Sequence, residues 1–401
     1  MSTLKVDAIR HNSATSDAIT TVADGTCTAK LTSVGGGGLS HRNKVINGAM
    51  TVSQRATSKA MGNSENAYVC VDRFKFTNVH DGAVTVSQSS TSPDGFGKSV
   101  KVDVTTADTN IITSQRLHII HYIEAQDLQD LSYGTSGAKE ARISFYVRSN
   151  KTGNYTFALN QADNSYKNIS IQYTINSANT WERKSFVIPG DTAGVINDDN
   201  GTGIELYWWL AAGPTYTSGS LRSDWTSYSN GDFAAGQGVN LLDSTSNEFY
   251  LTGVQFEVGD TVTSFEHRSY AEQLLRCKRY YQRSTDSSRG TDYSLSTGTW
   301  HSADGAQSFS KHNTYYDWKQ NFEIEMRVAP TLTIYGSSNQ GDIHLESIAV
   351  GSKQVDWNNN TTEVRTKGFL LRHIEDGSDG NYTSGSGNAF GILAYTLDAE
   401  L

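Results

Sequence analysis

The sequence has few prolines, cysteines and charged residues, and these shortages narrow the class of protein. Its 401 residues include 4 prolines and 3 cysteines, and 19% of them are charged. Cys27, Cys70 and Cys277 are odd in number and show no CxxC spacing, which argues against a disulfide framework and a zinc site. No apolar run approaches the roughly 20 residues that span a bilayer, and no basic head with an apolar stretch opens the chain. We therefore expect a protein that is made in a cytoplasm, lacks a secretory signal and does not insert into a membrane.

Catalytic and cofactor signatures are also missing from the sequence. It contains no G-x-S-x-G elbow, P-loop or H-E-x-x-H motif, so we expect no catalytic residues, no cofactor and no enzyme. The net charge of −9 disfavours binding to nucleic acid. His118 and His121 come nearest to a metal cluster, but residues three apart on a strand point to opposite faces. We expect no metal site, although calcium stays open for the oxygen-rich loops 197–201 and 375–381 beside their ordinary role as turns.

The residues that are present indicate an all-β protein. Glycine is abundant, with 36 residues, long helical patterns are almost absent, and short runs of alternating polarity recur. The alternation is cleanest in 98–104 and 169–175, so each of these strands should have one face in a core and one in water. Strands are predicted at 79–87, 99–104, 141–148, 155–160, 168–175, 183–188, 205–210 and 249–258. About eight strands with this spacing predict a jelly-roll β-sandwich over residues 39–268.

A stretch from 247 to 283 separates two β-rich regions. Its first part alternates as a strand, and Gly253 shifts the alternation by one residue, as a β-bulge would. Ser269, with Glu272 three residues later, is a capping-box pattern that predicts a linking helix over 269–283. The remaining residues, 284–401, predict a smaller C-terminal β-sandwich. Its expected strands are 321–328, 331–335, 344–350, 363–374 and 390–397.

The N-terminal residues 1–38 are expected to form an attachment arm. Apolar residues alternate weakly with polar ones there, but they are too few for an independent core. These residues are Leu4, Val6, Ile9, Ile19 and Val22. Such a segment is either disordered or ordered by pairing with other chains, and the recurring alternation favours pairing. The glycine run 35–38 that follows is a flexible joint.

Five motifs stand in an order that is typical of one family. They are RNKVINGAMTVSQR (42–55), VDRF (71–74), FYLTGVQFEVG (249–259), LRCKRYY (275–281) and MRVAPT (326–331). In this order they resemble tail-fibre and host-recognition proteins of tailed bacteriophages, and residues 2–10 and 18–20 resemble the segment with which such fibres begin. The resemblance covers most of the chain. It implies a trimeric virion structural protein with an N-terminal virion-attachment segment and a carbohydrate-binding-module-like jelly roll, and it supplies no catalytic residues.

Aromatic residues are the candidates for a binding function, because sugars stack on Trp and Tyr rings while polar side chains fix their hydroxyls. Neighbouring tryptophans on a strand point to opposite faces, so one should be in the core and the other outward or at an interface. The predicted strand 205–210 and the long loop 213–238 that follows it supply the candidates. They are Trp208, Trp209, Arg222, Asp224, Trp225 and Tyr228. Trp300 and Trp318 form a second candidate group. For both groups, packing within or between subunits is the alternative.

We therefore expect a trimeric fibre protein that resides on the virion and adheres to host-surface glycans without turnover. Its expected partners are further copies of itself, host-surface polysaccharide and other virion proteins, with tail and capsid both open. Two alternatives remain. One is a virion-associated polysaccharide depolymerase, whose carboxylate pair depends on separation in space. The other is a purely structural capsid- or tail-bound fibre without receptor binding.

Overall fold

The computed structural model describes residues 40–284 without a break. Elsewhere it describes residues 6–10, 12–13, 18–21, 23, 27–29, 306–308, 310–312, 315–335, 342–347, 351–356, 361–374, 389–392 and 394–401. As expected, the described chain is almost entirely β-structure with a few short helices. Among these residues no helix has the length and apolar character needed to cross a membrane.

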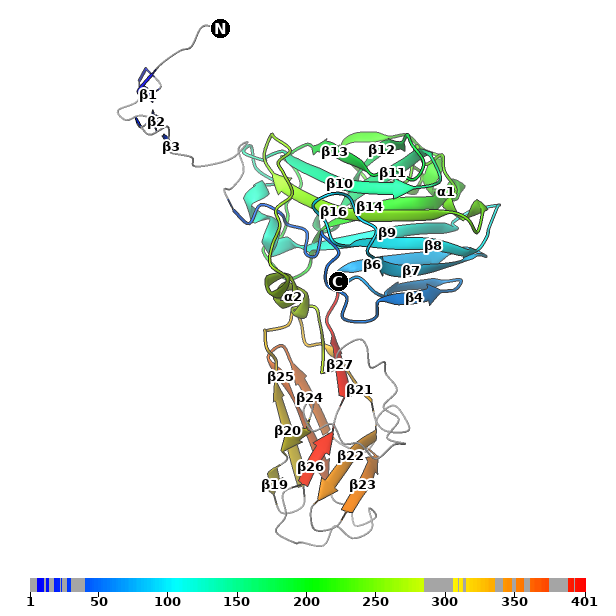
Figure 1. Ribbon diagram of the computed structural model, residues 1–401, viewed down its shortest axis with the longest axis vertical. Helices are drawn as coiled ribbons and strands as arrows, with labels where there is room; N and C mark the ends of the chain where they lie inside the picture. Colours follow the sequence, from blue (N-terminus) through cyan, green and yellow to red (C-terminus); the bar gives the residue numbers. More distant parts are fainter. Residues whose placement is uncertain are drawn as a thin grey trace.

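Two antiparallel sheets pack against each other and form the jelly-roll sandwich (Figure 1). The six-stranded sheet has the order β13 (Glu182–Ile188), β10 (Ala141–Ser149), β16 (Glu248–Val258), β8 (Ser99–Thr106), β7 (Ala83–Ser89) and β4 (Ser58–Met61). The seven-stranded sheet has the order β15 (Arg222–Thr226), β12 (Lys167–Ile175), β11 (Gly153–Gln161), β14 (Thr202–Ala212), β9 (Arg116–Glu124), β6 (Phe74–Val79) and β5 (Glu65–Tyr68). Side chains from both sheets meet in one large apolar core.

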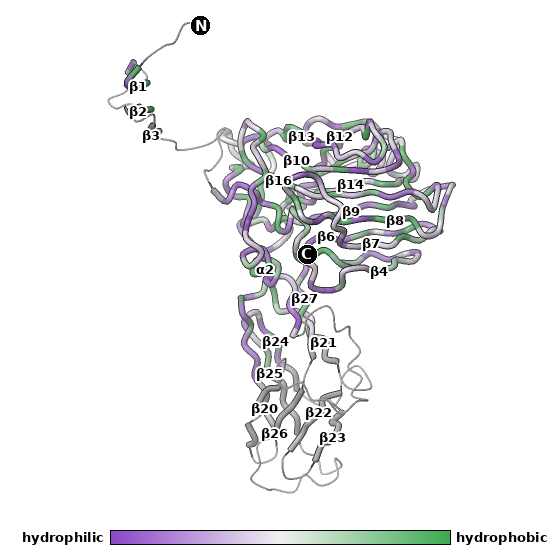
Figure 2. The backbone as a smooth tube through the Cα atoms, in the orientation of Figure 1, coloured by the Kyte–Doolittle hydropathy of each residue, from purple (hydrophilic) through white to green (hydrophobic). Residues whose placement is uncertain are grey.

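The alternating polarity of single strands explains how the core is filled. In β8, Val100, Val102 and Val104 are buried, whereas Lys101 and Asp103 on the other face are partly exposed. Figure 2 shows the same change between apolar and polar residues along the strands of the sandwich. The prediction of one buried and one wet face for 98–104 is therefore confirmed.

One expected strand near the start of the sandwich is wrong, and another strand was missed. Residues 79–87 are not one strand, because β6 ends at Val79 and β7 begins at Ala83 in the other sheet. Between them Gly82 N donates to His80 Nδ1 at 2.9 Å and closes a turn. The central strand β9 was not predicted. Its residues are mostly buried on both faces, so their polarity does not alternate in the way that reveals a half-exposed strand.

The β-bulge expected at Gly253 is present in β16. The pairing of β10 with β16 changes register between Ser144 and Tyr146, so two residues of β16 oppose one of β10. Gly253 has a φ of 62°, a left-handed conformation that glycine adopts without steric cost. A Cβ atom here would lie 2.8 Å from both Phe96 Cζ and Tyr146 Cδ2. Backbone conformation and aromatic packing therefore both require glycine.

The linking helix is present but shorter than the predicted 269–283. Ser269 caps α2 (Tyr270–Lys278), because its Oγ accepts a hydrogen bond from Glu272 N at 3.2 Å. The chain leaves the helix at Arg279 and continues as β17 (Tyr281–Arg283), which pairs with β27 (Ala394–Asp398). This pairing explains why the helix stops early. In Figure 1, α2 lies between the sandwich and the C-terminal β-region.

The C-terminal region forms three small antiparallel sheets. Their orders are β17–β27–β21 (Thr331–Tyr335), then β18 (Ala306–Ser308)–β26 (Ala389–Ile392)–β22 (Asp342–Ser347)–β23 (Gly351–Asp356), then β19 (Ser310–His312)–β20 (Tyr315–Asn321)–β25 (Gly368–Ile374)–β24 (Thr361–Arg365). The expected strand over 363–374 is instead the hairpin β24–β25. The expected strand at 321–328 is also wrong, since residues 322–330 contain none. That segment docks on its surroundings through Met326 N to Thr366 O (2.8 Å) and Arg327 N to Arg279 O (2.9 Å).

The N-terminal residues form a three-stranded sheet of β1 (Ala8–Ile9), β2 (Ile19–Thr21) and β3 (Cys27–Ala29). Val6 and Ile9 are exposed and Ile19 is half-buried, while Leu4 and Val22 lie outside the described residues. A sheet with strands of 2 or 3 residues buries too little apolar surface to be stable alone. What this arm pairs with stays a prediction.

Candidate functional site

A row of polar side chains crosses the outer face of the seven-stranded sheet. Asn168, Asn160, Glu205 and Tyr122 are successive direct partners on β12, β11, β14 and β9. Direct partners share a face, and successive residues of a strand alternate between faces. Leu206, next to Glu205, lies in the sandwich core. The row therefore points away from the core.

The loop 213–238 folds back over one part of this outer face. It contains α1 (Pro214–Thr217), β15 and the short helix η3 (Asn230–Asp232). Phe233 and Ala234, which follow η3, pack with Tyr207 and Trp209 in a second, smaller apolar cluster. The Phe233 ring lies edge-on to both rings, with centroids 4.6 Å and 5.1 Å away. The insertion is thus an ordered part of the domain that packs against the sheet.

An ion pair between two residues of the insertion stabilises its conformation. Arg222 donates from Nε and Nη2 to Oδ2 of Asp232 at 2.9 Å and 2.8 Å. Asp232 is buried, and its Oδ1 accepts from Ser220 N at 2.8 Å. Both oxygens therefore connect residues 220–222 with the short helix η3 inside the loop.

Glu205 is a buried carboxylate at the centre of the polar row, with 7% of its surface exposed. Its Oε2 accepts hydrogen bonds from Asn160 Nδ2 at 3.0 Å and from Tyr207 Oη at 2.7 Å. Burial raises the pKa of Glu205, while these two hydrogen bonds and the charge of Lys75 oppose the rise. Burial and then the charge of Glu205 raise the pKa of Tyr122 and of Tyr207. The hydroxyls of both tyrosines thus lie in the field of one carboxylate.

Two exposed tyrosines stand at the edge of this row. Tyr166 precedes β12 and Tyr228 follows β15, and they are 49% and 40% exposed. Their ring centroids are 6.5 Å apart at an interplanar angle of 67°. Burial, then Tyr216, then Glu205 raise the pKa of Tyr228, which brings its hydroxyl into the same field. We name Tyr166, Tyr228, Glu205, Asn160 and Asn168 the tyrosine site.

The two amides of the tyrosine site hold unused hydrogen-bonding capacity. Asn160 Oδ1 and both Oδ1 and Nδ2 of Asn168 are buried without a hydrogen-bond partner in the described part of the chain. Buried polar atoms are nearly always paired, so each exception needs an explanation. Because these atoms are buried, a ligand at the surface does not reach them, and an enclosed water is the partner that would satisfy them.

The structure corrects the prediction for the neighbouring tryptophans. Trp208 and Trp209 point to opposite faces, as expected, but both are 0% exposed. Trp208 lies in the main core, whereas Trp209 faces outward and is covered by the insertion. Neither ring offers a surface on which a sugar could stack.

The other predicted site residues do not gather at one place in the structure. Trp225 is half-buried against the core and donates from Nε1 to Pro189 O at 2.8 Å, which makes it a packing residue. Arg222 is committed to Asp232, and Asp224 is exposed on β15. Only Tyr228 of the predicted group joins the tyrosine site. Trp300 lies outside the described residues, and so does the side chain of Trp318 in β20.

Sequence reasoning missed Tyr166, Asn160 and Asn168 as site residues. Asn160 is the last residue of one predicted strand and Asn168 the first residue of the next. Only the pairing of β11 with β12 places them side by side. Tyr166 stands in a turn where Ser165 and Tyr166 both have positive φ, 52° and 56°. A tyrosine beside a turn carries no signal of function in a single sequence.

Metal candidates do not come together in the described residues, where no group of three potential ligands is found. His118 packs on Trp209 at the outer face and His121 on Phe74, so the two rings diverge as predicted for a strand. In the loop 197–201, Asp199 Oδ1 accepts from Gly201 N at 2.8 Å, the usual role of such residues in a turn. The loop 375–381 lies outside the described residues.

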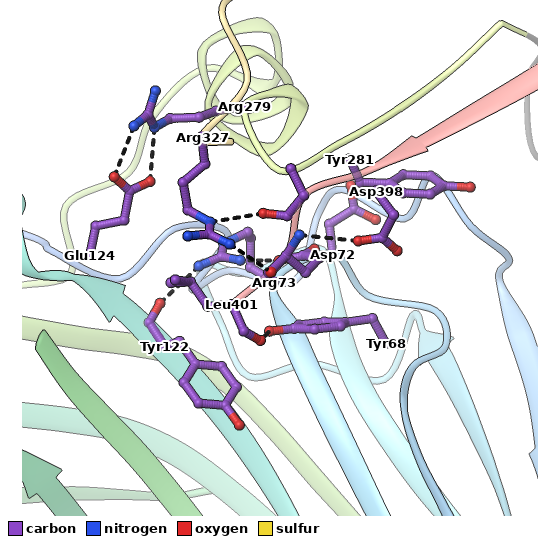
Figure 3. A network of polar contacts seen from close by, with 12 residues as sticks. Tyr68, Asp72, Arg73, Tyr122, Glu124, Arg279, Tyr281, Arg327, Asp398 and Leu401 are labelled. Carbon is purple, nitrogen blue, oxygen red and sulfur yellow. Dashed lines mark hydrogen bonds and ion pairs between the residues drawn. The ribbon is translucent and has the colours of Figure 1, made fainter. Parts of the chain in front are cut away.

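A second polar cluster lies at the junction of the sandwich with the C-terminal region (Figure 3). The fully buried Arg73 pairs with Glu400 and donates to Tyr122 O at 2.9 Å. Arg55 pairs with Asp398 at 2.9 Å and with Glu400 at 3.3 Å. The C-terminal residues are thus held against the sandwich by two arginines.

Other arginines complete the same cluster. Arg327 donates from Nε to Ala399 O at 2.9 Å and from Nη2 to Glu400 O at 3.0 Å. Arg279 forms a bidentate pair with Glu124 at 2.8 Å and 2.9 Å. Because carboxylates and carbonyls of the chain itself take up these cations, we assign the cluster a structural role. Arg279, at the C-terminal end of α2, therefore serves the domain junction.

Comparison with known proteins gives weak likenesses only. No family model and no curated protein sequence matches the chain. Among solved structures, the enzymatically active domain of tailspike protein 4 from bacteriophage CBA120 is similar at a TM-score of 0.29 and 11% identity, over 54% of this chain and 21% of that one. A putative sugar binding protein from Bacteroides thetaiotaomicron is similar at 0.29 and 11%, over 54% and 100%. A xylan-binding domain from CBM 22 is similar at 0.28 and 12%, over 50% and 98%. Likenesses at these TM-scores do not establish what this chain binds.

Proposed function

We propose that this chain is an adhesion protein of a phage virion whose jelly roll binds host-surface glycans at the tyrosine site. One observation carries the binding proposal: two exposed tyrosine rings meet at the edge of the polar row, within the field of the Glu205 carboxylate. Sugars bind by stacking an apolar face on an aromatic ring while a few fixed polar groups hold their hydroxyls. The order of the five sequence motifs supports the fibre role.

Glycan binding is tested by comparing two exposed tyrosines. Tyr228→Ala should abolish retention of the full chain on host-surface polysaccharide, because the ring at the site is lost. Tyr270→Ala is the matched control, since Tyr270 is 59% exposed on α2, outside the tyrosine site. Equal loss in both variants, or no loss in Tyr228→Ala, would refute the site.

We further propose that binding occurs without turnover. Glycoside hydrolysis usually needs a second carboxyl group about 5–10 Å from the first. Among the described residues, Lys75 is the charged group that shifts the pKa of Glu205, and no second carboxyl group contributes to that shift. The depolymerase alternative predicts that new reducing ends appear when host polysaccharide is incubated with the chain, and that Glu205→Gln stops their release. Their appearance would replace the adhesion proposal with an enzymatic one.

Assembly and position on the virion belong to the same proposal. The chain would form a homotrimer that is anchored through the N-terminal sheet, whose small size favours pairing with a partner. Light scattering of the purified chain should give three times the monomer mass. Particles assembled without residues 1–38 should lack the protein. A constant monomer mass at all concentrations, or normal incorporation after the deletion, would contradict this assembly.

A further inference from the structure

A groove of about 380 Å³ lies on the sheet that β20, β25 and β24 form in the C-terminal region. Figure 1 shows these three strands side by side. Two rows of direct strand partners share the face that carries the groove. They are Lys319, Leu370 and Glu363, and then Asn321, Gly368 and Arg365. Phe369 points to the opposite face and is 3% exposed, so both rows face away from the interior of this region.

The middle strand forms the floor of this groove. Gly368 has no side chain, and a Cβ atom there would lie 2.5 Å from Gln320 O, so the close approach of two backbones keeps this place empty. Leu370, the next residue on the same face, is half-buried and apolar. The flanking strands carry long charged side chains, Lys319 on β20 and Arg365 on β24. The groove therefore has a low apolar floor between charged walls.

Cations outnumber carboxylates around the groove. Lys319, Arg365 and Lys367 line it, and Glu363 is the one carboxylate among its described lining residues. Arg365 donates from Nε to Glu363 Oε1 at 2.7 Å, and Lys367 Nζ lies 3.4 Å from Oε2 of Glu325 outside the groove. Both pairs are exposed and contribute little, so a ligand can compete for either cation. Lys319 is exposed and has no ion pair within the described part of the chain.

These features fit a small anion that also has an apolar face and hydroxyl groups. The volume falls within the roughly 300–1,000 Å³ of small-ligand sites. The guanidinium fork of Arg365 matches a carboxylate or a phosphate, and the Lys319 ammonium adds a second positive charge. Leu370 offers an apolar surface to the C–H face of a sugar ring, and the exposed Asn321 amide can bond to hydroxyls.

Other anionic ligands fit the groove less well. The stacking of a nucleotide base needs an accessible aromatic ring, but Phe369 is buried and is the one aromatic residue among the described lining residues. The net charge of −9 opposes the binding of a long polyanion such as a nucleic acid. An acidic sugar combines the anionic group, the apolar ring face and the hydroxyls that the groove can contact.

We infer that this groove is a second glycan site and that it binds an acidic sugar unit, one that carries a carboxylate or a phosphate. The anionic group binds to Lys319 and Arg365, and the sugar ring lies over Leu370 and Gly368. The inference goes beyond the proposed function, because it depends on none of the residues of the tyrosine site and concerns a different region of the chain.

Acidic and neutral polymers test the class of ligand on the full wild-type chain. Binding is measured by affinity electrophoresis at about 10 mM salt, where charges act over about 30 Å. The acidic probes are polygalacturonate and a phosphomannan, and the comparisons are galactan, mannan and polyglutamate. At least one acidic polysaccharide should bind tenfold more tightly than its neutral counterpart and fivefold more tightly than polyglutamate, and the one that does identifies the anionic group. Equal binding of acidic and neutral polysaccharides, or of acidic polysaccharides and polyglutamate, would overturn the inference.

A lysine variant with a matched control locates the binding. Lys319→Gln should weaken binding of the acidic polysaccharide at least fivefold. Lys139→Gln removes the same charge from the sandwich, where Lys139 is exposed and has no ion pair within the described residues. A melting curve confirms that both variants fold. Equal weakening by the two variants, or none by Lys319→Gln, would show that the groove is not the site.

Removing the carboxylate of the groove should act in the opposite direction. Glu363→Gln frees Arg365, so the acidic polysaccharide should bind at least threefold more tightly, whereas Asp94→Asn, at an exposed position of the sandwich, should change binding less. Unchanged or weaker binding by Glu363→Gln would contradict the inference. Failure of the proposed function looks different. In about 1 M salt, where charges act over about 3 Å, the groove contributes nothing and retention is tested by Tyr228→Ala alone.

Discussion

The guanidinium carbon of Arg73 lies 3.4 Å from the centroid of the Tyr280 ring, in the interior of the domain junction. Arg73 is fully buried, and Glu400 supplies its counter-charge from the C-terminal residues. A second arginine repeats the arrangement, since Arg55 stacks on Tyr281 at 3.8 Å and pairs with the same Glu400. The orientation of the C-terminal region on the sandwich therefore depends on two stacked cations that share one carboxylate.

Removing that carboxylate should weaken the junction strongly. Glu400→Gln keeps the shape of the side chain but leaves Arg73 as a buried cation without its counter-charge. Breaking a buried pair in this way costs roughly 3–5 kcal/mol. The expected result is a lower free energy of unfolding, measured by chemical denaturation with the fluorescence of the buried Trp208 and Trp209 as the signal. Glu363→Gln is the control, because its partner Arg365 is exposed and such pairs contribute little. Similar effects of both variants would contradict the assignment of the junction.

Asp72 should make the stability of the junction depend on pH. Burial raises the pKa of this carboxyl to about 6, against the opposing charge of Arg55 and the hydrogen bonds from Gln54. A carboxyl whose pKa is higher in the folded state contributes stability below its unfolded pKa. That contribution is lost as pH rises from about 4 to about 6, and amounts to up to about 3 kcal/mol.

The test compares Asp72→Asn with the wild type between pH 4 and 7. The introduced amide would bring its nitrogen against Gln54 Nε2, so a constant offset between the two proteins is expected at every pH. The informative quantity is the change in that offset, which should favour the variant by up to about 3 kcal/mol as pH rises. An offset that is the same at pH 4 and pH 7 would show that Asp72 is ionised normally in the folded protein.

Local signals in the sequence were sufficient for part of the fold. The alternation in 98–104, the bulge at Gly253 and the cap at Ser269 are each determined by residues close in sequence, and all three are present. Strand β9 could not be found this way, because its outer face is covered by residues far along the chain. A strand was predicted over 321–328, but beyond Asn321 this segment docks through Met326 and Arg327 instead, which only the tertiary structure reveals.

The bulge supplies a direct test of one correct prediction. Gly253→Ala would place a Cβ 2.8 Å from two aromatic rings on a backbone with φ of 62°. Left-handed strain and overpacking together should cost about 2–4 kcal/mol of unfolding free energy. Gly97→Ala is the control, because nothing lies within 4 Å of a Cβ there and its φ is ordinary. Equal stability of the two variants would disprove the packing at the bulge.

Tyr166 should separate binding from stability. Its φ of 56° is strained for a residue with a Cβ, and the residue is 49% exposed. Strain at an exposed residue that adds nothing to the core is typical of functional positions. Tyr166→Gly and Tyr166→Ala both remove the ring and should both lose glycan retention. The glycine variant should be more stable than the alanine variant by about 1 kcal/mol, because only glycine relieves the strain. A more stable alanine variant would refute the strain.

The candidate site was harder to predict than the fold, because contacts between residues far apart in the sequence decide which aromatic rings are exposed. Tryptophan is the strongest sequence signal for stacking on a sugar, yet the indole of Trp209 is covered by Phe233 from the insertion. The tyrosines that are exposed, Tyr166 and Tyr228, come from segments about 60 residues apart and meet only because β12 pairs with β15. The sequence around each of them does not distinguish them from other tyrosines of the chain.

Helix α2 allows the proposed trimer to be tested without unfolding the chain. Leu274 is half-buried against the cluster of Ile46, Val52, Cys277 and Tyr280, so Leu274→Asp should destabilise the junction whether or not the chain assembles. Leu275 is 46% exposed and does not belong to that cluster. If α2 lies near the threefold axis, Leu275→Asp places three like charges together and should convert trimers to folded monomers. Light scattering gives the mass, and a melting curve confirms folding. Intact trimers of Leu275→Asp would place the helix away from the axis and leave α2 with the junction as its single role.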